Sequence, residues 1–348
     1  MLPRVTPPTY LEAIATPALV VDMAALDHNL ATMADALPGT RCRPHVKAHK
    51  TTALARRQRE RGHIAFTCAT PREIVGMAGA GLGDDLLLAN EIVDPDLLAT
   101  LAGLDARVTI AVDSEATIDA AARSGLRECL IDVNVGMPRC GCRPDDAGRL
   151  AEHARMRGLT VRGVMGYEGH VVGLADRAER ERQCAESMAL LARAHDAVGG
   201  DIVSAGGTGT FDCNALGTEI QAGSYALMDT AYGALDLPFR LALCIVATVI
   251  SINDHDGFAV ADAGLKALGM DHGNPLITTL DGDETVIWYC ADEHSVFGAV
   301  DGAALPGIGD RVRIWPAHID PTIAYHERLH LASGNAIVET WPVDLRGW

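Results

Sequence analysis

The sequence predicts an α/β fold, a (β/α)8 TIM-type barrel with a C-terminal all-β domain, from three observations. Eight short apolar runs alternate with helical patterns between residues 43 and 223, as in a parallel sheet covered by helices. Eight such units favour a closed barrel over an open doubly wound sheet. After Gly233 the chain changes to β-rich segments separated by turn residues, which predicts a second, all-β domain.

The eight predicted barrel strands are short, and each precedes a segment of helical periodicity. They cover residues 43–47, 64–67, 85–88, 108–112, 129–133, 161–165, 202–204 and 219–223. The intervening segments, such as 145–157 and 176–197, carry apolar residues at i, i+3 and i+4. Pro71 and Pro95 stand at the starts of two of these segments, where the first helical turn tolerates proline.

The N-terminal segment is assigned to the all-β domain. Residues 16–22 are a ninth strand candidate that a barrel of eight cannot use, and we expect the β domain to recruit it. The predicted domains are a barrel over residues 23–235 and a β domain over residues 236–348, joined by the N-terminal strand 1–22. The predicted strands of the β domain cover residues 241–252, 258–261, 285–290, 311–315 and 335–341.

The composition excludes several classes of protein. Hydrophobic residues make up 48% of the 348 residues and charged residues 22%, which is typical of a compact globular protein. The net charge of -17 would repel a nucleic acid backbone, so no nucleic acid partner is expected. The longest apolar run, 241–252, is too short for a membrane span, and residues 1–10 lack the apolar core of a signal peptide. We therefore expect a cytoplasmic protein without a membrane partner.

A basic segment, residues 43–50, stands out in this acidic chain at the end of the first predicted strand. The active sites of barrels lie at the C-terminal ends of their strands. A lysine there, with its pKa depressed by burial and by cationic neighbours, is suited to forming a Schiff base with a carbonyl compound. Lys47 is the better candidate, because Lys50 falls in the following loop. A solvated basic loop is the alternative interpretation.

Two glycine-rich turns end the last two predicted strands. In residues 204–210, Gly207 and its neighbours let backbone N–H groups approach a phosphate, and Thr208 adds a hydroxyl donor. In residues 221–225, Gly223 and Ser224 form a second edge for the phosphate, and barrel phosphate sites are often built from these two loops. Either turn by itself can also be interpreted as an ordinary loop between a strand and a helix, with no ligand. Combined with a lysine at a strand end, they suggest pyridoxal 5'-phosphate (PLP).

Three further residues follow predicted strands in the middle of the barrel. Arg139 is a candidate for binding a carboxylate or a cofactor oxygen, and Tyr167 for packing on a cofactor ring. His170 is a candidate for moving a proton or for holding a metal-bound water. Each of the three is also compatible with a solvated surface role.

Two histidine motifs lie in the predicted β domain. His318 and Asp320 are two residues apart, hence on one face of an extended segment, and prolines flank them. This spacing predicts two ligands of a divalent ion, although so short a pattern also arises by chance. Residues 326–330 match the His-Glu-x-x-His pattern of zinc proteases, which requires a helix. Apolar residues at 323, 325, 329 and 331 have a period of two, so we expect extended chain and reject the protease interpretation.

Together these motifs resemble the D-threonine aldolase family, which is related to the eukaryotic-type D-serine dehydratases among alanine-racemase-like enzymes. The resemblance covers nearly the whole chain and rests on residues 16–22, 43–47, 139–141, 167–170, 206–210, 221–232 and 318–321. It implies a fold-type III PLP enzyme whose Lys47 carries the cofactor. Gln221 takes the place where alanine racemases have an arginine against the pyridine nitrogen, which argues against simple racemisation. The implied cofactor-binding set is Lys47, Thr70, Arg139, Tyr167, Ser204, Gly207, Thr208, Gln221, Gly223, Ser224 and Tyr232.

The function that the resemblance implies is retro-aldol cleavage of D-β-hydroxy-α-amino acids of the D-threonine type to glycine and an aldehyde. Lys47 and His170 are the expected catalytic residues. His318 and Asp320 are expected to hold Mn2+ or Mg2+ in preference to Zn2+, because a carboxylate is a hard ligand. One alternative is a metal-dependent D-serine or D-threo-3-hydroxyaspartate dehydratase that yields a 2-oxo acid and ammonia. Another is a non-catalytic PLP carrier, which would need no metal. The resemblance also implies a homodimer.

Overall fold

A computed structural model describes residues 9–300 and 303–348, which fold into two compact units. The β unit comprises the described part of Met1–Asn29 together with Ala226–Ala234 and Pro238–Val343. The barrel unit comprises Leu30–Tyr225, Leu235–Leu237 and Asp344–Trp348. Within the described ranges, none of the helices combines the length and the hydropathy that a membrane span requires.

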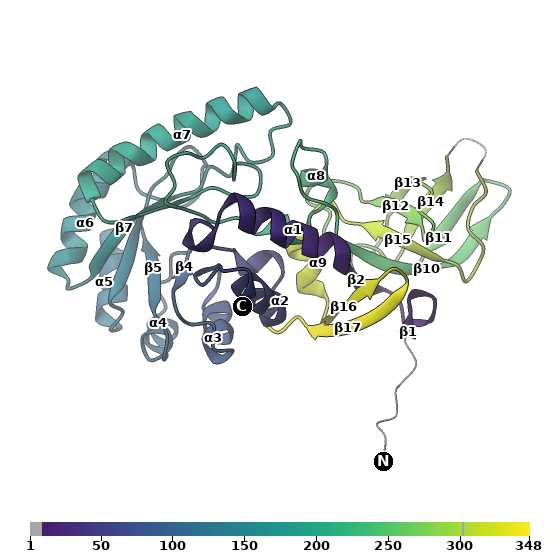
Figure 1. Ribbon diagram of the computed structural model, residues 1–348, viewed down its shortest axis with the longest axis horizontal. Helices are drawn as coiled ribbons and strands as arrows, with labels where there is room; N and C mark the ends of the chain where they lie inside the picture. Colours follow the sequence, from purple (N-terminus) through teal and green to yellow (C-terminus); the bar gives the residue numbers. More distant parts are fainter. Residues whose placement is uncertain (1–8, 301–302) are drawn as a thin grey trace, which may run out of the picture. The chain divides into compact units, whose positions relative to one another are not determined.

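The barrel unit is built on seven parallel strands that lie in sequence order. They are β3 (Phe66–Cys68), β4 (Leu86–Leu88), β5 (Val108–Val112), β6 (Glu128–Asp132), β7 (Thr160–Gly166), β8 (Ile202–Ala205) and β9 (Glu219–Ile220). The helices that alternate with them are α2 (Thr52–Glu60), α3 (Pro71–Gly79), α4 (Pro95–Ala102), α5 (Glu115–Arg123), α6 (Ala147–Met156) and α7 (Arg177–Val198). Helices α3 to α6 follow one another along the outer side of the strands (Figure 1). The predicted strand and helix alternation is confirmed.

The segment expected as the first barrel strand, residues 43–47, is not a regular strand. Pro44 has no N–H to donate to a ladder, and the chain turns into the 3-10 helix η3 (Val46–Ala48). Residues 42–45 nevertheless bond to both edges of the sheet. The Arg43 N–H donates to the Ile220 carbonyl at 2.9 Å, and the Thr67 N–H donates to the Pro44 carbonyl at 2.9 Å. This irregular segment therefore joins β9 to β3 in place of an eighth strand.

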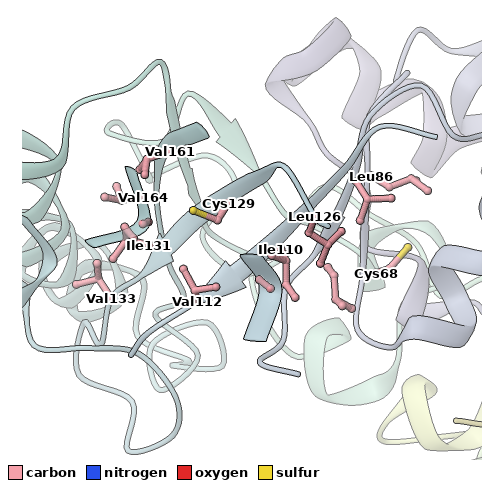
Figure 2. Close-up of a cluster of buried hydrophobic side chains, with 14 of the residues drawn as sticks. Cys68, Leu86, Ile110, Val112, Leu126, Cys129, Ile131, Val133, Val161 and Val164 are labelled. Atoms are coloured by element: carbon pink, nitrogen blue, oxygen red, sulfur yellow. The ribbon is translucent and has the colours of Figure 1, made fainter. Parts of the chain in front are cut away.

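Both faces of the barrel strands are buried, as expected for a parallel sheet. In β4, Leu86 and Leu88 face a core cluster that includes Ile74 of α3 and Leu98 of α4. Leu87, between them, belongs to a separate cluster on the opposite face of the sheet. Figure 2 shows the first of these clusters, in which alternate residues of successive strands point to the same side. The continuous apolar runs in the sequence reflect this burial on two faces.

The β unit is built on a ten-stranded sheet that includes the N-terminal strand. Its main path is β1 (Thr9–Tyr10), β17 (Ala336–Pro342), β16 (Arg328–Ser333), β2 (Ala18–Asp22), β10 (Leu243–Asn253), β11 (Phe258–Ala261), β14 (Ser295–Ala299) and β13 (Thr285–Cys290). Strand β15 (Arg311–Trp315) pairs with β10 and with β12 (Leu276–Thr279). Strand β2 pairs antiparallel with β10 and parallel with β16, so the expected recruitment of residues 16–22 is observed.

The remaining elements are short, apart from α1. They are α1 (Met23–Ala36), α8 (Thr230–Gly233), α9 (Ile319–Tyr325), η1 (Leu11–Ala13), η2 (Gly39–Arg41), η4 (Pro144–Asp146) and η5 (Ser224–Ala226). Strands β12, β14 and β16 lie outside the predicted strand set.

Helix α9 corrects the expectation of an extended segment around residues 316–325. His318 is its N-cap and Asp320 lies in its first turn, where Pro321 is tolerated because early N–H groups have no intrahelical acceptor. The Thr322 hydroxyl donates to the His318 carbonyl at 2.7 Å and closes this turn. Ile323 also lies in the helix, so the period of two was misleading there. Residues 326–330 leave the helix and enter β16, which excludes the helical zinc-protease motif.

Candidate active site

The two lysines of the segment 43–50 have different surroundings. The Lys50 ammonium donates to the Glu73 carboxylate at 2.5 Å, and Glu73 is fully buried. Glu73 also accepts from the backbone N–H of Ala69 at 2.6 Å, so the pair is tied to the start of α3. Lys47 lies in η3, beyond the C-terminal end of the irregular segment, where barrel active sites are found. Lys50 is engaged in this ion pair with Glu73, and Lys47 remains the predicted site of nucleophilic chemistry.

His45 is a neutral neighbour of Lys47. Its Nδ1 accepts from the Lys47 backbone N–H at 3.5 Å. Burial lowers the pKa of His45 well below its usual value, and the positive charges of Lys47 and Lys50 lower it further. The imidazole therefore adds no positive charge beside Lys47.

Arg139 and Tyr167 meet above the strand ends. The Arg139 guanidinium carbon lies 5.6 Å from the centroid of the Tyr167 ring, within cation–π range. The same ring packs on the backbone of Gly207, where an added Cβ would lie 3.3 Å from a ring carbon. His170 is exposed and packs on Gly136, where an added Cβ would lie 2.7 Å from its Cε1. The loops after β6, β7 and β8 thus converge on one place.

The loops after β8 and β9 also meet in the barrel unit. The Gln221 amide donates to the Ser204 hydroxyl at 2.9 Å. The Tyr225 N–H donates to the Thr208 Oγ1 at 2.9 Å, which leaves the Thr208 hydroxyl proton to be donated elsewhere. At Gly223 an added Cβ would lie 2.7 Å from the His45 carbonyl oxygen, so Ser224 and its neighbours lie beside the Lys47 segment.

Two members of the predicted cofactor set make hydrogen bonds at the starts of helices. Thr70 is the N-cap of α3, and its hydroxyl accepts from the Glu73 N–H at 3.2 Å in a capping box. Tyr232 belongs to α8 of the β unit, where its N–H donates to Asp229 at 2.9 Å. The others, on Lys47, Arg139 and the loops after β7, β8 and β9, lie in the barrel unit.

The predicted metal pair lies in the β unit beside two further candidate ligands. The His318 Nε2 is 3.7 Å from an Asp320 carboxylate oxygen, while its Nδ1 is 2.7 Å from Asp271. The His272 ring stacks on the His318 ring with centroids 3.9 Å apart and planes inclined by 6°. Partial burial raises the pKa of Asp271, but the hydrogen bond and charge of His318 outweigh it, so the net shift is downward.

The distances separate two possible roles of the carboxylates around His318. Two ligand atoms that each lie about 2.1 Å from one ion, at roughly 90–110°, are about 3.0–3.5 Å apart. The Nε2 to Asp320 separation of 3.7 Å is close to this span. The Nδ1 to Asp271 separation of 2.7 Å is a hydrogen bond instead. In the tautomer with the proton on Nδ1, His318 donates to Asp271, and its Nε2 then has a lone pair directed away from this bond.

Two family models match the chain. The alanine racemase N-terminal domain matches residues 21–230, and a serine dehydratase domain matches residues 242–332. The D-threonine aldolase of an Arthrobacter species is 34% identical over 99% of this chain and 96% of its own length. The chain belongs to the D-threonine aldolase family.

Other comparisons agree with membership of the D-threonine aldolase family. The 3-hydroxy-D-aspartate aldolase of Paracoccus denitrificans is 32% identical over 96% of this chain and 92% of that protein. The crystal structure of D-threonine aldolase from Filomicrobium marinum has a TM-score of 0.92 and 32% identity, covering all of this chain and 99% of that chain. The resemblance inferred from the sequence motifs is confirmed.

Several residues beside the site were not found by sequence reasoning. Asp271 and His272 lie 47 and 46 positions before His318, so no local spacing links them to it. Asp132 ends β6, and burial raises its pKa well above the usual value, with the nearby Glu91 raising it further. Glu168, next to Tyr167, is fully buried. For Asp132 and Glu168, the sequence offered only a carboxylate beside apolar residues as an indication of a buried charged group.

Proposed function

We propose that this chain is a PLP-dependent and divalent-metal-dependent lyase that cleaves the Cα–Cβ bond of D-β-hydroxy-α-amino acids of the D-threonine type to glycine and an aldehyde. The observation that carries the proposal is the match to D-threonine aldolase over 99% of the chain. Two features of the chain support it. One is a strand-end lysine whose neighbour Lys50 is tied to Glu73, and the other is a His318–carboxylate group in the β unit.

The residues of the barrel unit fit PLP. Lys47 supplies the amine, while Gly207 and Gly223 keep open positions that a side chain would fill. Thr208 and Ser224 offer hydroxyl donors to the phosphate, and the Gln221 amide is an uncharged partner for the ring nitrogen. When bound, PLP supplies an electron sink for the pair left on Cα.

Arg139 and Tyr167 orient what Lys47 binds. The guanidinium has donors for a carboxylate or for the cofactor oxygen, and its contact with the Tyr167 ring at 5.6 Å fixes its place. Tyr167 is in turn fixed by its packing on Gly207. His170, exposed on the same loop as Tyr167, is the group that we propose takes the proton of the β-hydroxyl.

His318 Nε2 and the Asp320 carboxylate are proposed as the ligands of the divalent ion. When bound, the ion supplies positive charge that makes a hydroxyl a stronger acid. We propose that Asp271, whose carboxylate lies 2.7 Å from the His318 Nδ1, orients the ring so that Nε2 is directed to the ion. Because Asp320 is a hard oxygen ligand, we propose Mn2+ or Mg2+ in preference to Zn2+.

A dehydratase is the second candidate, and the serine dehydratase domain match over residues 242–332 favours it. Elimination of the hydroxyl needs a strong Lewis acid, whereas Asp320 favours an ion that only acidifies the hydroxyl. A PLP carrier is less well supported, because the match to the Arthrobacter aldolase covers 96% of that enzyme and includes the β unit. We also propose a homodimer in the cytoplasm.

The products from D-threonine test the reaction. Purified enzyme with PLP and Mn2+ is expected to form glycine and acetaldehyde in equal amounts, and to leave L-threonine unchanged. Chromatography of the amino acids and derivatisation of the aldehyde would quantify them. Ammonia and 2-oxobutanoate in stoichiometric yield would assign the chain to the dehydratases, and no turnover with intact PLP binding would favour a carrier.

A further inference from the structure

Glu168 is a fully buried carboxylate beneath the loop of residues 206–214, here called the phosphate loop. Its Oε2 accepts from the Gly206 N–H at 3.1 Å. Its Oε1 accepts from the Thr210 hydroxyl at 2.7 Å and from the Asn214 amide at 3.0 Å. The Cys184 thiol, 3.7 Å from Oε1, is a fourth donor, and its hydrogen bond with Cys213 together with burial raises the pKa of this thiol. All four partners are neutral.

These bonds extend through the whole phosphate loop. Thr210 Oγ1 donates to Glu168 and accepts from the Gly207 N–H at 3.2 Å. Asn214 extends the network beyond the loop, because its Oδ1 accepts from the Gly217 N–H at 3.0 Å. One carboxylate therefore anchors three residues, 206, 210 and 214, spaced four apart. The backbone of residues 207–209 lies between two anchored residues, Gly206 and Thr210.

The loop leaves donors available on its other side. In the part of the chain that the structure describes, no acceptor is seen for the backbone N–H groups of Thr208 and Gly209. The Thr208 hydroxyl accepts from Tyr225 and keeps its own proton for another acceptor. Gly209 packs directly on the loop after β7, where an added Cβ would lie 1.8 Å from the Val172 carbonyl oxygen, so the backbone cannot shift in that direction. These donors suit an anion of the phosphate class.

Burying a carboxylate among neutral partners costs folding free energy. The hydrogen bonds by which Glu168 orders the phosphate loop have to offset that cost. Every partner of Glu168 is a donor, and only a carboxylate accepts from all of them. A glutamine would place its NH2 against a donor N–H or O–H. The negative charge also opposes a phosphate dianion electrostatically.

We propose that Glu168 is a positioning residue that holds the phosphate loop in the conformation that binds the phosphate of PLP. The proposal rests on the proposed PLP dependence. If the charge of Glu168 acted only by repelling the phosphate, its removal would strengthen phosphate binding. The proposal predicts the opposite: replacing the carboxylate by an amide of the same size weakens phosphate binding.

The test compares PLP with pyridoxal, which lacks the phosphate, in binding to the apoenzyme of three variants. They are Glu168→Gln, Thr210→Val and, as a control, Glu186→Gln on the exposed face of α7. Dissociation constants come from the absorbance of the bound aldehyde and from quenching of tryptophan fluorescence. We expect Glu168→Gln to raise the dissociation constant of PLP about 10- to 100-fold and to leave that of pyridoxal unchanged. Thr210→Val removes one of the anchors and should give a smaller rise.

Three outcomes would overturn the proposal. They are a dissociation constant of PLP that is unchanged or lower in Glu168→Gln, an equal weakening of PLP and pyridoxal, and a Thr210→Val variant that binds PLP like the control if Glu168→Gln does not fold. Failure of the wild-type protein to bind PLP at all would instead contradict the proposed function. Near-ultraviolet circular dichroism of each apoenzyme checks that the tertiary structure is kept.

Discussion

The Lys50 ammonium and the Glu73 carboxylate form a hydrogen-bonded ion pair of 2.5 Å, and Glu73 has no exposed surface. Breaking this pair would leave a buried charge unpaired, which is strongly destabilising. Lys50 is therefore a structural residue that fixes the start of α3 to the end of η3. Lys47, three residues earlier, is the lysine that we propose for covalent chemistry.

Borohydride reduction of the PLP complex is accordingly expected to fix the pyridoxyl group on Lys47. Lys47→Ala should lose both the absorbance of the covalently bound cofactor and the activity, because no other amine replaces it. Lys50→Met should keep the absorbance but unfold at a lower temperature. Peptide mapping by mass spectrometry locates the label, and a pyridoxyl group found on Lys50 would contradict the assignment.

Removal of the divalent ion should abolish activity while PLP remains bound. We expect His318→Ala and Asp320→Ala to lose the bound metal in elemental analysis, and we expect Mn2+ to restore the chelator-treated wild type. His255→Ala, at an exposed histidine elsewhere in the β unit, is the matched control. Full activity of metal-free enzyme would show that the histidine and the carboxylate are only structural.

Asp271→Asn tests the orienting role separately from ligation. The asparagine keeps the size of the side chain but loses the charge that holds the Nδ1 proton of His318, so the affinity for Mn2+ should fall about 10- to 100-fold. Asp256→Asn is a close control, because Asp256 also bonds to a histidine, His255, at 2.8 Å on the surface. Titration calorimetry measures both. An unchanged affinity in Asp271→Asn would remove Asp271 from the metal site.

Acid sensitivity is expected from His63, which is 1% exposed. Burial lowers its pKa below the usual 6.5, and a bond of its Nδ1 to the Gly39 carbonyl at 3.0 Å only partly opposes this. Below the unfolded-state pKa, the unfolded chain takes up a proton that the folded chain does not. Stability is therefore lost as the pH falls below 6.5, by up to about 1.4 kcal/mol per pH unit for this group.

His63→Gln removes the titrating group and keeps a donor for Gly39. The urea midpoint of this variant should fall less than that of the wild type between about pH 7 and about pH 5.5. An identical fall in the two proteins would assign the acid sensitivity to other groups, such as His45.

The buried pair of Arg43 and Glu219 should be essential for the barrel unit. Its Nε–Oε1 distance is 2.7 Å, and the two side chains are 2% and 7% exposed. Glu219→Gln leaves the buried guanidinium with only Asp85, at 3.3 Å, as its charge partner, and is expected to cost about 3 kcal/mol of unfolding free energy, the lower end of the range for a broken buried pair. Glu115→Gln, at the exposed pair with Arg149, should cost about 1 kcal/mol or less. Similar losses in both variants would contradict the role of burial.

The barrel strands could be predicted because burial on both faces leaves unbroken apolar runs such as Leu86–Leu88. The irregular segment 42–45 could not be recognised in this way. Its apolar and polar residues fit a strand, and only the missing N–H of Pro44 and the turn into η3 distinguish it.

The sequence yields site predictions where the chemistry is local in sequence. Lys47, Arg139 and the pair His318 and Asp320 stand in short motifs, and their identities alone indicated a role. The helical start at His318 was missed, since a helix of seven residues gives little periodicity. Asp271 and Glu168 were missed because their partners are distant in sequence and meet them only in the folded chain.

Closure of the barrel through residues 42–45 has a consequence for the order of folding. Arg43 finds its partner Glu219 176 positions later, and the His45 N–H finds the carbonyl of Ala222. During synthesis from the N-terminus, Arg43 and His45 cannot form these bonds until the last barrel strand has left the ribosome. Growing chains therefore carry an unpaired sheet edge for most of translation, a long-range contact pattern that slows folding and calls for chaperone protection.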